Sequence, residues 1–222
     1  MLLKKLFKYR FELFFYSSII ILFGSLIFPK QVLNSVIMPL LFVLNIASGL
    51  VIFKKRKRQT LVVIGMLTLV SFVFFYRLVS KSEERILEYI RFFVYFGFYA
   101  LVTVEIISQV WNAKRVNKTM IFGLMSGYIS IGFIGFFIFN CIEMIVPGSF
   151  SGLKEVGMTP SNIDDLMYFS YITLMTIGYG EITPISDIAQ KASMFLAMAG
   201  QFYLVIVTAV VIEKYIKHSQ KE

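Results

Sequence analysis

Six long apolar segments, separated by short groups of basic residues, dominate this 222-residue sequence. A helix needs about 20 consecutive apolar residues to cross the hydrocarbon core of a membrane. The segments are Leu13–Phe28, Val32–Phe53, Leu61–Tyr76, Ile90–Trp111, Met120–Val146 and Ile188–Ile212. The sequence therefore predicts an all-α membrane protein with six transmembrane helices.

The composition excludes a soluble enzyme domain. Hydrophobic residues make up 58% of the chain and charged residues 16%, whereas soluble domains have roughly 45–50% and 25%. Cys141 is the only cysteine and His218 the only histidine, so a disulfide framework, a cysteine metal cluster and a Ser/His relay are all excluded. We expect no enzyme activity, no catalytic residue and no cofactor.

The basic residues lie at alternate ends of the six segments. The groups are Lys4, Lys5, Lys8 and Arg10; Lys54–Arg58; Lys114, Arg115 and Lys118; and Lys214, Lys217 and Lys221. With six spans they all fall on one side, which the positive-inside rule identifies as the cytoplasm. We therefore expect a multi-pass protein of the cell membrane with both termini cytoplasmic. The basic excess sets this orientation and favours contact with anionic lipid over nucleic acid.

A seventh apolar segment, Ile163–Thr176, is too short to cross the membrane, because 14 residues of helix extend only about 20 Å. Pro160, Ser161 and Asn162 are residue types that favour a helix start. The sequence predicts a re-entrant pore helix whose partially negative C-terminal end points toward the membrane centre, where it favours a cation.

The run that follows this segment can present backbone oxygens to a cation. It reads Thr173-Leu174-Met175-Thr176-Ile177-Gly178-Tyr179-Gly180-Glu181-Ile182-Thr183-Pro184. Glycine adopts backbone angles closed to other residues. If ordinary and left-handed residues alternate, successive carbonyls turn toward one axis and replace the water around a dehydrated ion.

This run resembles the selectivity filter of the potassium channel family with six transmembrane spans and a single pore loop. The resemblance implies a filter formed by Thr176, Ile177, Gly178, Tyr179 and Gly180. The K+ ligands would be the carbonyls of the first four of these residues and the Thr176 hydroxyl. K+ is then the permeant ion rather than a cofactor.

The resemblance also implies residues that support the filter. These are Tyr168, Phe169, Thr173, Glu181 and Glu143. Simple apolar packing of the aromatic pair and a plain interfacial role for Glu143 remain as alternatives. Glu181 stands where the family more often has Asp, and Met175 where a small or hydroxyl residue is common, so both affect fine behaviour such as inactivation or conductance.

One chain holds one such loop and shows no internal repeat, whereas a closed ring of carbonyls needs four loops. The resemblance therefore implies a homotetramer around a four-fold axis. Its other partners would be membrane lipid and K+ ions.

The last span carries candidates for a gate and a cavity lining. Gly200 resembles a hinge glycine of potassium channel inner helices, or it allows close helix packing. Gln201, Leu204, Thr208 and Ile212 share one stripe of the helix, which faces either the cavity or the fifth span. Four glycines of the fifth span, Gly123, Gly127, Gly132 and Gly135, permit a close neighbour.

We predict two domains: a four-helix domain over residues 1–113 that resembles a voltage sensor, and a pore domain over residues 114–222. The fourth span has Arg91 as its only base, so we expect little voltage dependence. Glu105 in this span is either functional or, as we favour, reaches the inner membrane interface.

The function predicted from sequence is a passive potassium-selective channel. Two alternatives remain: a weakly selective cation channel, and a non-conducting regulatory subunit of a potassium channel.

Overall fold

A computed structural model describes residues 7–26, 37–53, 56–80, 85–113, 117–154 and 160–219, and these residues are almost entirely helical. The helices are α2 (Arg10–Phe23), the short 3-10 helix η1 (Gly24–Leu26), α4 (Met38–Leu50), α5 (Lys57–Ser80), α6 (Arg85–Trp111), α7 (Lys118–Ile145), α8 (Pro160–Leu174) and α9 (Asp187–Ser219). Two short strands, β1 (Phe150–Ser151) and β2 (Thr183–Pro184), pair antiparallel.

Among the described residues, four helices are long and apolar enough to cross a membrane. They cover Lys57–Tyr76, Tyr89–Trp111, Lys118–Ile145 and Asp187–Lys214, and they correspond to the third to sixth predicted spans. The sequence-based expectation of an all-α membrane protein therefore holds in its coarse form.

The first two predicted spans are described only in part. Helix α2 has 14 residues and α4 has 13, so each extends only about 20 Å within the described residues. Residues 27–28 of the first predicted segment and 32–36 of the second lie outside the described residues. The count of six spans stays a prediction.

The chain divides into two compact units, residues 1–127 and residues 128–222, and the division falls within α7. The first turns of α7 belong to unit 1 because they contact α2. The Phe122 ring lies 5.3 Å from that of Phe15, and the Ser126 hydroxyl donates to the Phe11 carbonyl at 3.3 Å. The predicted functional boundary after residue 113 stays a prediction.

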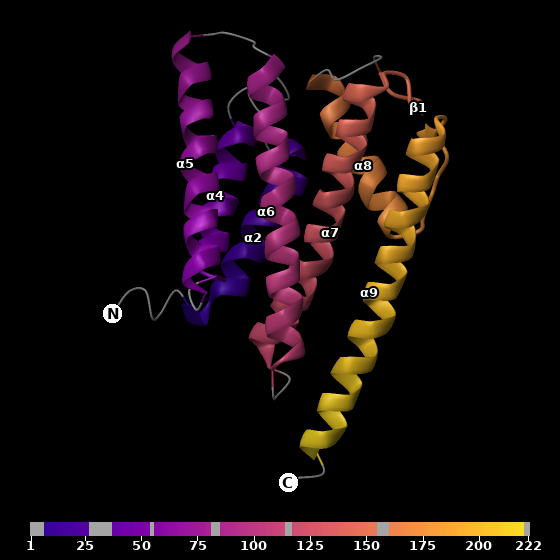
Figure 1. Ribbon diagram of the computed structural model, residues 1–222. Helices are drawn as coiled ribbons and strands as arrows, with labels where there is room; N and C mark the ends of the chain where they lie inside the picture. The colour runs from indigo at the N-terminus through magenta and orange to yellow at the C-terminus, as the bar shows by residue number, and fades with distance from the viewer. Residues whose placement is uncertain are drawn as a thin grey trace. The chain divides into compact units, whose positions relative to one another are not determined.

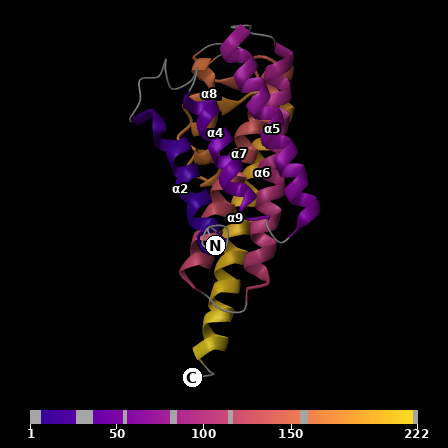
Figure 2. The same cartoon turned by 90° about the vertical axis from the view of Figure 1, so that its left-hand side faces the viewer.

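In unit 1, helices α2, α4, α5 and α6 run side by side as a bundle (Figures 1 and 2). Asn45 is fully buried in this bundle and joins three of the helices. Its amide donates to Ser17 Oγ at 2.8 Å and Ser18 Oγ at 2.9 Å, and its oxygen accepts from the Tyr99 hydroxyl at 2.8 Å. Each polar atom of the buried amide therefore has a partner, as burial in an apolar core requires.

In unit 2, helix α8 lies between α7 and α9 (Figure 1). Gly132 and Gly135 of α7 make this possible, since a Cβ on Gly132 would overlap Tyr171 and a Cβ on Gly135 would overlap Leu196. The Ser170 hydroxyl donates to the Gly132 carbonyl at 2.7 Å. The fifth-span glycines 132 and 135 thus permit the close neighbour that the sequence predicts.

Candidate functional site

The end of α8 is continuous with the predicted filter through backbone hydrogen bonds. The amides of Met175, Thr176 and Ile177 donate to the carbonyls of residues 171, 173 and 172 at 2.9, 3.0 and 2.8 Å. The last carbonyls of a helix normally lack intrahelical partners. Here three of these carbonyls, including that of Thr173, accept hydrogen bonds that fix the residues at the start of the predicted filter.

The backbone of the predicted filter alternates in handedness. The angle φ is positive at Thr176 (56°), Gly178 (56°) and Gly180 (95°), while Ile177 and Tyr179 between them are not in the left-handed region. A positive φ is an outlier for a β-branched residue such as Thr. This alternation is the one the sequence predicts for a row of carbonyls that face one axis.

Glu143 ties the outer end of α7 to the segment beyond the filter. Its side chain is fully buried, and its carboxylate accepts hydrogen bonds from the amides of Gly148 at 2.7 Å and Ser149 at 3.0 Å. The Ser149 carbonyl in turn accepts from the Ile185 amide at 2.7 Å. Strand β1, which follows these amides, pairs with β2, which follows the predicted filter.

The aromatic pair of α8 has two different environments. Phe169 is buried, and its ring lies 5.0 Å from that of Phe139 and 5.5 Å from that of Phe150. The exposed Tyr168 hydroxyl hydrogen-bonds to Glu181, and this bond raises the pKa of Tyr168 to about 12. Phe169 therefore packs against α7 and β1, while Tyr168 connects α8 to the residue that follows the filter.

Helix α9 meets the inner end of the filter at two consecutive residues. A Cβ on Gly200 would overlap the Leu174 carbonyl oxygen, so this glycine is a point of close packing. The Gln201 amide donates to Thr176 Oγ1 at 3.1 Å. The hinge role of Gly200 stays a prediction.

The remaining residues of the predicted cavity stripe are exposed on the single chain. Leu204 is 43% exposed and Ile212 53% exposed, and the exposed Thr208 donates its hydroxyl to the Leu204 carbonyl of its own helix at 2.7 Å. Both readings of this stripe, a cavity lining and a face packed on the fifth span, stay predictions. Its role as a gate stays a prediction.

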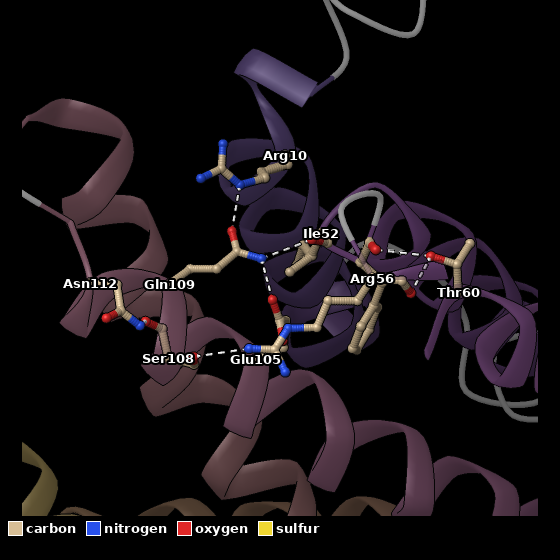
Figure 3. Close-up of polar contacts among 9 residues, drawn as sticks. Arg10, Ile52, Arg56, Thr60, Glu105, Ser108, Gln109 and Asn112 are labelled. Atoms are coloured by element: carbon tan, nitrogen blue, oxygen red, sulfur yellow. Dashed lines mark hydrogen bonds and ion pairs between the residues drawn. The ribbon is translucent and has the colours of Figure 1, made fainter. Parts of the chain in front are cut away.

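Glu105 lies in a buried polar network at the end of α6 (Figure 3). Its carboxylate forms an ion pair with Arg56 at 3.1 Å and accepts from the Gln109 amide at 2.8 Å. The same Gln109 amide donates to the Ile52 carbonyl, and its oxygen accepts from Arg10 at 2.9 Å. The network joins α2, α6 and the connection from α4 to α5.

The sequence analysis did not foresee this network. The Glu105 side chain is 6% exposed, and its place at the membrane interface stays a prediction. Two signals were present in the sequence: Gln109 stands four residues after Glu105, which places both on one helix face, and Arg56 lies in the basic group of the preceding connection.

One family model, described as "Ion channel", matches residues 127–217. The match covers most of α7, the whole of α8, the filter and nearly all of α9. No curated protein and no solved structure matches the chain. The matched segment therefore supports ion channel activity, and with the apolar helices it suggests a membrane protein that contacts ions and lipid.

Proposed function

We propose that four copies of this chain form a potassium-selective channel that conducts K+ passively across the cell membrane. The observation that carries the proposal is the filter of alternating handedness from Thr176 to Gly180, which is fixed to α8 at its inner end and to Tyr168 at its outer end. Backbone carbonyls in such a row are the ligands that replace the hydration shell of K+.

The homotetramer follows from stoichiometry and exposure. A single chain supplies one filter strand, in which Tyr179 is 72% exposed and Ile177 45% exposed. Helix α9 also leaves large apolar side chains uncovered, such as Phe195 at 67% and Val205 at 65%. Three further copies around a four-fold axis would cover one part of this surface, and lipid would cover the rest.

The proposal includes six spans with cytoplasmic termini and little voltage dependence. Steep voltage sensing needs several charges per subunit that move through the field, at about 2.3 kcal/mol per charge per 100 mV. Within Tyr89–Trp111, the described span of α6, the only charged residues are Arg91 and Glu105, and Glu105 is held by Arg56. Current recorded over a range of voltages should show no steep activation.

The test is K+ flux from proteoliposomes that contain the purified chain, with a sodium-only control. Gly178→Asp should abolish the flux, because a side chain is strained at φ 56° and the strain would disturb the row of carbonyls. Gly65→Ala is the matched control, since Gly65 has nothing within 4 Å of an added Cβ. Equal permeation of Na+ and K+ would sink selectivity, and an assembled tetramer without flux would favour a non-conducting subunit.

A further inference from the structure

Helix α8 ends at Leu174, two residues before Thr176, which is the first predicted ion ligand. The last four carbonyls of a helix have no partner within the helix. In α8, three of these four accept hydrogen bonds from the three amides that follow the helix, so the chain that enters the predicted filter satisfies them itself. The fourth, the Leu174 carbonyl, receives none of these bonds.

The Leu174 carbonyl takes its hydrogen bond from another helix. The hydroxyl of Tyr128 in α7 donates to it at 3.4 Å, and among the residues that the structure describes no second donor bonds to it. On the side of α9, Gly200 lies so close to the carbonyl oxygen that an added Cβ would overlap it. The carbonyl is therefore in contact with both neighbouring helices, and Tyr128 is its donor.

Tyr128 is one of two tyrosines whose hydroxyls connect α7 with α8, and the two bonds run in opposite directions. The Tyr171 hydroxyl of α8 donates to the Ile129 carbonyl of α7 at 2.7 Å. The Tyr128 ring also lies 5.7 Å from the ring of the buried Tyr203 in α9, a favourable distance for an aromatic pair. Of the two hydroxyls, only that of Tyr128 reaches the end of α8 from which the predicted filter continues.

We propose that Tyr128 is a positioning residue for ion selectivity, because its hydroxyl fixes the peptide group between Leu174 and Met175. This inference rests on the proposed function, since selectivity is a property of a conducting pore. The Met175 amide belongs to the same peptide group and donates to the Tyr171 carbonyl, so both ends of this group are hydrogen-bonded.

Loss of the Tyr128 hydroxyl would act on the filter through the chain. A carbonyl that is left without a donor away from water carries a free-energy cost, so the Leu174 peptide group would turn toward another partner. Thr176 follows one residue later and would be displaced with it. Selectivity depends on the arrangement of the oxygen ligands around the ion, and a displaced first ligand should therefore weaken it.

The experiment measures the permeability ratio of K+ to Na+ from reversal potentials in planar bilayers. Tyr128→Phe keeps the ring and removes only the hydroxyl, and it should lower the ratio about tenfold, the equivalent of about 1.4 kcal/mol. The thermal unfolding of each variant in detergent is recorded alongside, so that a loss of selectivity can be separated from a loss of stability.

Two variants serve as controls. Tyr171→Phe removes the same atom between the same two helices and loses the shorter bond, but it leaves the Leu174 carbonyl paired. Gln190→Leu removes bonds to the carbonyls of residues 184 and 185, which follow the predicted filter. Both should keep the parent ratio within about twofold, even if they unfold at a lower temperature.

The outcomes separate this inference from the proposed function. A parent chain that assembles but carries no K+ current would overturn both. A parent that conducts K+ selectively, with Tyr128→Phe within about twofold of its ratio, would overturn the role of Tyr128 alone. An equal loss of selectivity in Tyr171→Phe would also overturn it, because general packing between α7 and α8 would then explain the effect.

Mixed assemblies keep the inference testable if Tyr128→Phe does not assemble alone. Parent chains in excess are coexpressed with tagged variant chains, and assemblies are purified through the tag. Their permeability ratio should fall between that of the parent and that of a non-selective pore. A ratio equal to that of the parent would overturn the role of Tyr128.

Discussion

At the scale of single residues, a few side chains contact the predicted filter and the loop after it. Thr176 is bonded by Gln201, Glu181 by Tyr168, and the loop amides near β1 by Glu143. Residues of the same chain therefore contact both ends of the predicted filter.

Gly200→Ala should destabilise unit 2. The added methyl would overlap the Leu174 carbonyl oxygen, which is backbone and cannot move aside without disturbing the filter. Overpacking of this kind costs about 1–3 kcal/mol. The check is thermal unfolding in detergent, with Gly65→Ala as the control that has open space around it. Equal unfolding temperatures for the two variants would contradict a close-packing role for Gly200.

Tyr168→Phe should make the K+ current decay faster, because the outer end of the filter loses its bond to Glu181. The raised pKa of Tyr168 defines the pH range of this effect. Stabilisation by the neutral hydroxyl is complete below about pH 10 and is lost as pH rises through about 12. Between neutral pH and about pH 10, ionisation of Tyr168 should therefore not change the rate of current decay in the parent. A pH-dependent change in this range that Tyr168→Phe abolishes would refute this.

Single residues also show how far sequence reasoning reaches. Of the three positive φ angles at 176, 178 and 180, two could be predicted from the spacing of the glycines. Positions 178 and 180 hold glycine, which tolerates a positive φ. Among the partners of Glu105, Gln109 follows from its spacing of four residues. The Gln201–Thr176 bond and the Glu105–Arg56 ion pair do not follow from any local pattern. Each bond joins residues at least 25 positions apart, and only the tertiary fold brings them together.

At the scale of elements, the network around Glu105 joins the ends of helices in unit 1. Arg56→Gln should destabilise this unit, since it leaves the buried Glu105 carboxylate without its cation. We expect a loss of about 1–3 kcal/mol, below that of a fully buried pair because Arg56 is half exposed. The measurement is the free energy of unfolding in detergent, with the exposed Arg58→Gln as the control. Equal losses in both variants would show that the ion pair contributes nothing.

The elements predicted best are the long ones. An apolar run longer than about 18 residues has few structural options other than a spanning helix, and the helices α5, α6, α7 and α9 agree with the predicted spans. Helix α8 was predictable for a different reason, since helix-favouring residues precede an apolar run that is too short to cross. The first two predicted spans are described only in part, so they stay predictions.

At the scale of the whole molecule, the proposed assembly predicts a defined mass. Four copies of the 25.6-kDa chain, with bound detergent subtracted, should account for the purified particle. Light scattering combined with absorbance gives this mass directly, and Gln190→Leu should not alter it. A particle of one or two copies that still conducts K+ would refute the four-fold ring.

Each chain supplies one filter strand, and this has a genetic consequence. If parent and Gly178→Asp chains are expressed equally and mix at random, only about one assembly in sixteen contains four parent copies. All the remaining assemblies contain at least one altered copy, and a single altered copy disrupts the ring. A defective allele should therefore suppress the normal one far more strongly than loss of half the protein would.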